Sequence, residues 1–318
     1  MPGMRVTALC GGVGGAKLVL GLHSILRPGE LTVIGNTGDD IELFGLHISP
    51  DLDIVMYTLA GLVDQVKGWG IRDDTFAFLE TASSVYGQER WFNIGDRDLA
   101  THVLRTQLLR EKLSLTRVTA TLCDLLGLST RILPMSDDPV QTHVRIADGS
   151  LIHFEEYFVK RGCQDDVCGV EYVGSESAVV PPAVLGAIED ADVIVVCPSN
   201  PVASIGPILS VRGVRQALEK STVPIVGVSP LVGGRAVKGP TEKFMKGLGM
   251  PVSPAAVADY YGFLSHYVID RLDAGLKHTL EERGLHVTVT DTVMTTLESK
   301  KSLAETVILE SLGRAAHL

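Results

Sequence analysis

The sequence lacks a hydrophobic run of the roughly 18 residues that a membrane-spanning helix needs. Its first residues pass into a glycine-rich segment that carries Lys17, in place of the apolar core of a signal peptide. Basic residues are also few, since 28 Lys and Arg oppose 38 Asp and Glu for a formal charge of −10. A surface of that sign repels nucleic acid and anionic lipid. We therefore expect a cytoplasmic protein that binds neither.

Cysteine is scarce, with five residues scattered through the chain. Cys10 and Cys197 each end an apolar run, which is typical of reduced thiols in a protein core. Cys163 and Cys168 share a polar segment, where they could bind a metal or form a disulfide, although no second pair is present to complete a zinc site. The sequence therefore leaves the role of Cys163 and Cys168 open.

Hydrophobic residues make up 45% of the 318 residues, enough for a substantial core. Short apolar, β-prone runs alternate with stretches of three- and four-residue apolar spacing. This alternation predicts a doubly wound, mostly parallel, Rossmann-like α/β fold. The expected strands are residues 5–10, 31–35, 192–197 and 223–228, and the expected helices are residues 16–26, 52–63, 99–110, 115–126, 211–220 and 302–312.

The middle of the chain has a different pattern. Residues 142–146 and 151–159 are β-prone and flank a turn sequence at residues 147–150, which predicts an antiparallel hairpin. Residues 161–182 are polar and contain glycine, which favours an exposed connection. We expect residues 1–73 and 186–318 to form the nucleotide-binding core, and residues 74–185 to form an inserted helical and hairpin cap.

The first expected strand leads into Gly11-Gly-Val-Gly-Gly-Ala-Lys17 and then a helix. Successive backbone NH groups, a helix N-terminus and one ammonium group favour an anion site. The segment is not a Walker loop, because Leu18 stands where a magnesium-binding hydroxyl would follow the lysine. It is not a dinucleotide fingerprint either, because Lys17 replaces the third glycine. A tight strand-to-helix turn is the structural alternative.

Four carboxylates follow the second expected strand, in Asn36-Thr-Gly-Asp-Asp40 and at Asp51 and Asp53. Neighbouring acids repel one another unless a cation compensates them, and oxygen ligands suit Mg²⁺. A divalent cation beside a phosphate-binding segment is typical of phosphoryl transfer. The alternative is that Asp51 caps a helix and that Asp39 and Asp40 only form a turn.

Two later segments also carry polar groups. Residues 91–99 combine aromatic and charged side chains ahead of a helix with His102, which suits a flat ligand, although an N-capped amphipathic helix explains the pattern equally well. Ser199, Asn200 and Lys238 follow the later strands, at the edge where ligands bind in open α/β sheets. Turn formation alone is again the alternative.

Seven motifs, in order along the chain, resemble those of the 2-phospho-L-lactate transferase family. That family makes the deazaflavin coenzyme F(420) by moving a phospholactyl or phosphoenolpyruvyl group from a guanosine diphosphate-linked donor to the alcohol FO. GMP is released, and Mg²⁺ is required. The motifs are Gly11-Gly-Val-Gly-Gly-Ala-Lys17, Asn36-Thr-Gly-Asp-Asp40, Ser49-Pro-Asp-Leu-Asp53, Gly68-Trp-Gly70, Gly95-Asp-Arg-Asp-Leu99, Pro134-Met-Ser-Asp137 and Pro198-Ser-Asn-Pro201.

The resemblance implies a role for each matching position. Asp40 would accept the hydroxyl proton and Lys17 would stabilise the transferred phosphoryl group. Donor nucleotide binding would fall to Gly12, Gly14, Lys17, Asn36, Ser199, Asn200, Gly234 and Lys238. Mg²⁺ would bind Asp39, Asp40 and Asp53, and the deazaflavin would contact Asp53, Asp96, Arg97, His102 and Met135 beneath the cap. The resemblance also implies a homodimer.

The sequence leaves two other functions open. Gluconeogenesis-factor proteins share the glycine segment and the Asn-Thr-Gly-Asp-Asp motif, and they bind nucleotide sugars without turnover. A dinucleotide-dependent oxidoreductase is disfavoured, because Asn36 stands where such enzymes carry an acidic residue. Within the transferase reading, lactate, enolpyruvate and glycerate are all open as the three-carbon acid.

Overall fold

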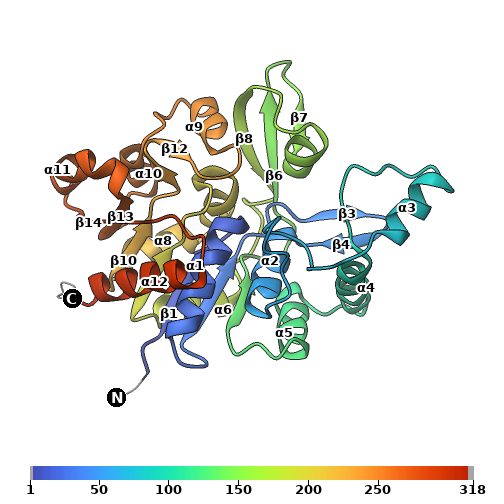
Figure 1. Cartoon of the computed structure of the whole chain (residues 1–318), viewed down its shortest axis with the longest axis horizontal. Helices are drawn as coiled ribbons and strands as arrows, with labels where there is room; N and C mark the ends of the chain where they lie inside the picture. The colour runs from blue at the N-terminus through green and yellow to red at the C-terminus, as the bar shows by residue number, and fades with distance from the viewer. Residues whose placement is uncertain (1–2, 314–318) are drawn as a thin grey trace.

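The computed structural model describes residues 3–313 and centres on a seven-stranded sheet (Figure 1). The strand order is β14-β13-β10-β9-β1-β2-β5, and every neighbouring pair is parallel. The expected parallel α/β sheet is therefore confirmed. Its strands are β1 (Val6–Cys10), β2 (Leu31–Gly35), β5 (Arg131–Pro134), β9 (Val193–Val196), β10 (Ile225–Val228), β13 (His266–Asp270) and β14 (His286–Thr290).

Helices cover both faces of this sheet, which explains why its strands are apolar without alternation. Side chains of β1 alternate between the two layers: Val6, Ala8 and Cys10 pack into one cluster, and Leu9 packs into the other. The first layer contains α1 (Gly12–Ile25), α2 (Pro50–Leu59), α5 (Leu115–Leu125) and α12 (Leu297–Ser311). The second contains α6 (Pro182–Glu189), α7 (Gly206–Ser210), α8 (Val214–Lys220) and α10 (Pro254–Tyr261).

The chain reverses its direction of strand addition at β1. From β1 it passes through α1 to β2 on one side, whereas β9 pairs with β1 on the other. Such a switch point leaves a crevice at the carboxyl ends of the two strands. The glycine segment that follows β1 and residues 197–200 that follow β9 therefore meet at one place.

Several smaller elements surround this edge of the sheet (Figure 1). The hairpin β3 (Ile41–Leu43) and β4 (Leu46–Ile48) contacts α4 (Asp96–Arg110), and α3 (Ala77–Ser84) projects beyond it. Further along the chain lie η2 (Pro201–Ile205), β11 (Leu231–Val232), β12 (Arg235–Ala236), α9 (Thr241–Gly247), η3 (Arg271–Leu276) and α11 (Lys277–Glu281). No helix within residues 3–313 has the length and apolar character needed to cross a bilayer.

The expected inserted cap is only partly correct. The hairpin is present as β6 (Gln141–Ile146) and β7 (Leu151–His153), but residues 156–160 form the π-helix η1 (Glu156–Lys160) instead of more strand. The expected exposed connection contains β8 (Val167–Val173), which pairs with β6 in a three-stranded antiparallel sheet. Strand β5 also lies within residues 74–185 yet pairs with β2, so the sheet does not respect the expected domain boundary.

Two local expectations also need correction. The first helix begins at Gly12 and not near Ala16, so the glycine segment is the first turn of α1 and not a separate loop. All five cysteines are free, which excludes a disulfide between Cys163 and Cys168 in this structure. Cys10, Cys123 and Cys197 are buried in the core.

Candidate active site

A cleft of about 600 Å³ opens at the switch point of the sheet. Residues that follow β1, β2, β9, β10 and β14 line it, together with residues of α2, α4 and η1. Nine of the residues expected from the sequence lie in its wall: Gly12, Gly14, Lys17, Asp39, Asp53, His102, Ser199, Asn200 and Lys238. The tertiary structure therefore gathers positions that lie as far apart in the chain as Gly12 and Lys238.

The first turn of α1 packs closely against residues 198–199. A Cβ atom on Gly14 would lie 2.6 Å from the carbonyl oxygen of Pro198, and one on Gly15 would lie 2.5 Å from the Ser199 hydroxyl. The Ser199 hydroxyl accepts a hydrogen bond from Gly11 N and donates one to Gly11 O. Glycine is therefore required for packing at these positions, and the same close approach brings the N-terminus of α1 to the cleft.

Two lysines give this side of the cleft a positive charge. Burial lowers the pKa of Lys238, and the nearby Lys17 ammonium lowers it further. Lys238 Nζ donates to the carbonyl of Lys67 over 2.9 Å, and neither Lys17 nor Lys238 belongs to the lysines that form ion pairs within residues 3–313. Two ammonium groups without carboxylate partners, beside a helix N-terminus, suit a phosphate group.

Asp51 does not cap its own helix, because Ser49 and Pro50 begin α2. Its carboxylate instead accepts hydrogen bonds from Gly12 N at 2.8 Å and from Asn36 Nδ2 at 2.9 Å. Burial raises the pKa of Asp51 to about 6, and these two hydrogen bonds oppose the rise. Asn36 is fully buried in this role and does not line the cleft, so its expected direct contact with the donor is not seen.

Asp39, Asp51 and Glu155 form an acidic wall beside the lysines. Burial raises the pKa of Asp39 well above its ordinary value, and the charges of Asp51 and Glu155 raise it further. Burial, with Asp51 and Asp40, raises the pKa of Glu155 to about 8. Asp39 Oδ1 is buried and has no hydrogen-bond partner within residues 3–313. Asp39 and Glu155 therefore lack compensation, whereas Asp51 is held by its two hydrogen bonds, and these three acids do not bring their ligand atoms as close together as Asp53, Asp98 and His102 do. Oxygen ligands of this type suit a divalent cation.

Asp40, the expected proton acceptor, is absent from the wall of the cleft. Its Oδ2 accepts a hydrogen bond from the Ser49 hydroxyl at 2.8 Å and lies 2.9 Å from His47 Nε2. Burial raises the pKa of Asp40, although both partners lower it. Oδ2 is thus committed to the hairpin, whereas Oδ1 is buried and has no hydrogen-bond partner within residues 3–313. Because Asp40 does not line the cleft, its position does not support the expectation that it takes the substrate proton.

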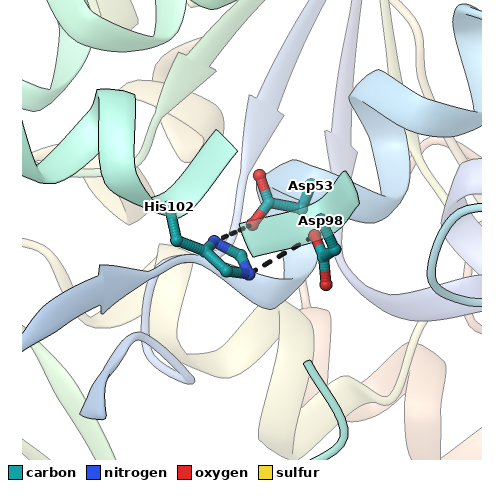
Figure 2. A group of neighbouring side chains, drawn as sticks. All are labelled: Asp53, Asp98 and His102. Atoms are coloured by element: carbon teal, nitrogen blue, oxygen red, sulfur yellow. Dashed lines mark ion pairs between the residues drawn. The ribbon is translucent and has the colours of Figure 1, made fainter. Parts of the chain in front are cut away.

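Asp53 is also compensated within the chain, and Figure 2 shows its ion pair with His102. Both of its oxygens accept from the guanidinium of Arg105, which is fully buried. His102 Nδ1 lies 3.7 Å from Asp53, and His102 Nε2 lies 3.3 Å from Asp98. Because Arg105 neutralises Asp53, this residue is a weaker Mg²⁺ ligand than the sequence suggests.

Besides Tyr57, four aromatic side chains line the same cleft as this charged network. Trp69 and Phe92 come from the segments that precede α3 and α4, and Phe154 and Phe158 come from the end of β7 and from η1. Phe154 and Phe158 stack with ring centroids 5.5 Å apart and planes inclined by 10°. An apolar wall of this kind suits a planar ring.

Four expected contact residues lie outside the cleft. Met135 is fully buried in the hydrophobic layer under the sheet. Asp96 accepts hydrogen bonds from Ala77 N and Phe78 N, so it orders the start of α3. Arg97 is exposed and donates to a backbone carbonyl, and Gly234 lies in the turn between β11 and β12. Of the motifs that contain Asp96, Arg97 and Met135, only residues 95–99 reach the cleft, through Asp98, and the side chains of Met135, Asp96 and Arg97 serve the scaffold.

The geometry agrees with comparisons to known proteins. The family model described as 2-phospho-L-lactate transferase CofD matches residues 6–307. The chain belongs to this family. It is 44% identical over 306 residues to a phosphoenolpyruvate transferase of Streptomyces griseus, covering 95% of this chain and 96% of that protein. It is 42% identical over 299 residues to a 2-phospho-L-lactate transferase of Methanosarcina mazei, covering 94% and 97%.

A solved structure gives the same fold at low identity. The UPF0052 family protein of Bacillus halodurans superposes with a TM-score of 0.66 at 16% identity, covering 97% of this chain and 99% of that one. Membership of the CofD family makes this chain a transferase, as expected from its motifs.

Sequence reasoning missed part of the site of this CofD family member. Glu155 lies within the second strand of the expected hairpin, residues 151–159, and no local pattern distinguishes it from Glu156. The helical spacing does place Asp98 beside His102, because Asp98 lies four residues before it on one helical face, and Arg105 follows three residues later. Their partner Asp53 belongs to a different helix, so only the fold reveals the network.

Proposed function

We propose that this transferase moves a phospholactyl or phosphoenolpyruvyl group from a guanosine diphosphate-linked donor to the ribityl hydroxyl of FO, and releases GMP. The observation that carries the proposal is the division of the cleft into two charged walls. Lys17, Lys238 and the N-terminus of α1 supply positive charge that no carboxylate pairs with among residues 3–313, and the acidic side chains of Asp39, Asp51 and Glu155 line the same cleft. Phosphoryl transfer with a divalent cation requires this combination.

Asp39, Asp51 and Glu155 would hold the Mg²⁺ ion, with Asp51 also holding the first turn of α1. A magnesium ion at these carboxylates would neutralise charge on the phosphoryl oxygens and on the GMP leaving group. This assignment replaces Asp40 and Asp53 of the expected set with Asp51 and Glu155. The reason is that Asp40 lies behind the wall and Asp53 is neutralised by Arg105.

The donor would lie across the first turn of α1. Lys17 and Lys238 would bind its phosphates, and free NH groups of the turn would add hydrogen bonds. Asn200 Oδ1 accepts from Val202 N and Ala203 N, which leaves its Nδ2 group free to donate to the guanine. These contacts would fix the transferred phosphorus in line with the attacking hydroxyl.

In the reaction, the hydroxyl oxygen of the acceptor forms a bond to the phosphorus that carries the three-carbon acid. The bond from this phosphorus to the GMP oxygen breaks, and GMP leaves with the electron pair. A loose transition state demands little from a general base, so the hydroxyl proton can pass late to a carboxylate of the cleft. The deazaflavin ring would lie against the aromatic wall formed by Trp69, Phe92, Phe154 and Phe158.

The test is direct. Purified protein is mixed with Mg²⁺, FO and either a guanylated phospholactate or a guanylated phosphoenolpyruvate, and products are measured by mass spectrometry. We expect GMP and the deazaflavin phosphodiester in equal amounts, and the preferred donor identifies the three-carbon acid. Binding of nucleotide without GMP release would refute the proposal and favour the regulatory function of gluconeogenesis-factor proteins.

We also place this reaction in the cytoplasm, in a homodimer. The free thiols of Cys10, Cys123 and Cys197 suit a reducing compartment. Exposed apolar side chains near α3, such as Val85 at 67% and Tyr86 at 72% exposure, could be covered by a second copy. Light scattering during size-exclusion chromatography would measure the mass, and a monomer at micromolar concentration would refute the dimer.

A further inference from the structure

One carboxylate oxygen of Asp98 contacts neighbouring side chains of the protein, and the other is open to the cleft. The Tyr57 hydroxyl donates to Asp98 Oδ1 over 2.7 Å, and His102 Nε2 lies 3.3 Å from the same oxygen (Figure 2). No side-chain or backbone donor within residues 3–313 bonds to Asp98 Oδ2. The side chain is 13% exposed and lines the cleft, so Oδ2 is the oxygen that a ligand can reach.

Arg105 determines how His102 faces Asp98. A guanidinium can only donate, so the 3.2 Å contact from Arg105 to His102 Nδ1 makes that nitrogen an acceptor. In the neutral imidazole the proton then lies on Nε2, toward Asp98. Burial disfavours ionisation of Asp98, but the contacts with His102 and Tyr57 outweigh burial and lower its pKa. Asp98 is therefore held as an oriented carboxylate.

A metal ion is the competing explanation for this group. One ligand atom each from Asp53, Asp98 and His102 lies within 4.8 Å of the others. However, Arg105 already donates to both oxygens of Asp53 and to His102 Nδ1. A cation placed here would share Asp53 with a buried guanidinium, and the two positive charges would repel each other. The hydrogen bonds fit an acceptor site for a neutral donor better than they fit a metal site.

We propose that Asp98 Oδ2 accepts a hydrogen bond from a hydroxyl group of the acceptor alcohol, and that Tyr57, His102 and Arg105 position it. The ligand class is a polyhydroxylated side chain attached to a planar ring, since Asp98 shares the cleft with the aromatic wall. This inference rests on the proposed function and adds to it the residue that recognises the hydroxyl chain. Asp98 contacts the substrate, whereas the other three act through it.

The experiment compares two deazaflavins by isothermal titration calorimetry. One is FO with its full ribityl chain, and the other is the same ring with a methyl group in place of the chain. We expect Asp98→Asn to weaken binding of FO about tenfold to a hundredfold, because a hydrogen bond to a charged acceptor is lost. Binding of the methyl analogue and of GDP should stay unchanged. Tyr57→Phe should weaken FO binding several-fold, with the same selectivity.

Asp73→Asn is the matched control, because Asp73 is 90% exposed and lies away from the cleft wall. Equal weakening of both deazaflavins by Asp98→Asn would overturn the inference, since a folding defect or ring contact would then explain the result. A metal site would be supported instead if Zn²⁺ stabilises the wild type, if His102→Gln abolishes this stabilisation and if Asp39→Asn keeps it. That result would overturn the inference.

The two proposals fail in different ways. If the wild type releases no GMP with FO under any donor, the proposed function fails and this inference fails with it. If the wild type turns FO over and Asp98→Asn binds FO as tightly as the wild type, this inference alone is wrong.

Discussion

Replacing Glu155 by glutamine should stabilise the metal-free protein, and the gain should grow with pH. Burial first, and then the charges of Asp51 and Asp40, raise the pKa of Glu155 from an ordinary 4.5 to about 8. Between these values the folded state keeps a proton that the unfolded state has released. Unfolding then releases protons, so stability falls as pH rises through this window.

The magnitude follows from the size of the window. At about 1.4 kcal/mol per pH unit, ionisation of Glu155 costs the folded state at most about 5 kcal/mol above pH 8, and under 1 kcal/mol at pH 5. Glutamine does not ionise and has nearly the same shape, so Glu155→Gln should recover this amount. Asp51, with a pKa raised to about 6, gives a smaller pH dependence of the same sign that remains in the variant.

The assay is unfolding by urea at pH 5, 7 and 8, with and without Mg²⁺. Mg²⁺ should stabilise the wild type by about 2.7 kcal/mol at a hundred times its dissociation constant, and most strongly at pH 8 where the carboxylates are ionised. Glu155→Gln should lose most of this Mg²⁺ effect. The matched control is Glu156→Gln, since Glu156 is a neighbouring, partly exposed residue paired with Arg161.

Two results would refute this reasoning separately. If Glu155→Gln is no more stable than the wild type at pH 8, ionisation of Glu155 does not destabilise the folded state. The description of Asp39, Asp51 and Glu155 as an acidic wall would then be wrong. If Mg²⁺ stabilises Glu155→Gln as much as the wild type, Glu155 is not a ligand and the proposed metal site is wrong.

Three further variants test other parts of the site. Lys17→Met should weaken GDP binding about tenfold or more, because it removes a charge-assisted contact to phosphate; calorimetry that finds unchanged binding would refute the donor assignment. Asp53→Asn should destabilise the fold by about 3 to 5 kcal/mol by leaving the Arg105 charge uncompensated, with Mg²⁺ affinity retained; urea unfolding and Mg²⁺ titration measure both. Met135→Ala should cost about 2 to 5 kcal/mol through a core cavity yet leave the KM for FO unchanged, and a raised KM would restore Met135 to the acceptor site.

Much of the fold could be predicted because its signals are local. Strands β1, β2, β9 and β10 are buried on both faces, so each is a short apolar run within two residues of its expected bounds. The doubly wound class followed from the alternation of strands and helices, whereas the reversal of strand order at β1 came from the structure. Strands β5, β8, β13 and β14 were not predicted. Pro134 ends β5 and Gly169 interrupts β8, and polar residues begin and end both β13 and β14, so none shows a clear apolar run.

In the candidate site, too, the features with a local sequence signal could be predicted and the others could not. The glycine segment, Lys17 and Asp39 were predicted correctly to border one cleft, because each directly follows a strand of the parallel sheet. Side-chain partners were not predictable in this way. Met135 directly follows strand β5, yet its side chain enters the core, since neighbouring residues along a strand end face opposite sides.

The sequence by itself determined the class of fold, the edge of the sheet where ligands bind and the family to which the chain belongs. These depend on strand patterns and on motifs that are continuous in the chain. Only the tertiary structure decided which carboxylates are compensated. Arg105 of α4 neutralises Asp53 of α2, and Glu155, which precedes η1, lies near enough to Asp39 to raise its pKa. The energy of a buried charge depends on its neighbours in space, and these come from segments that the sequence places far apart.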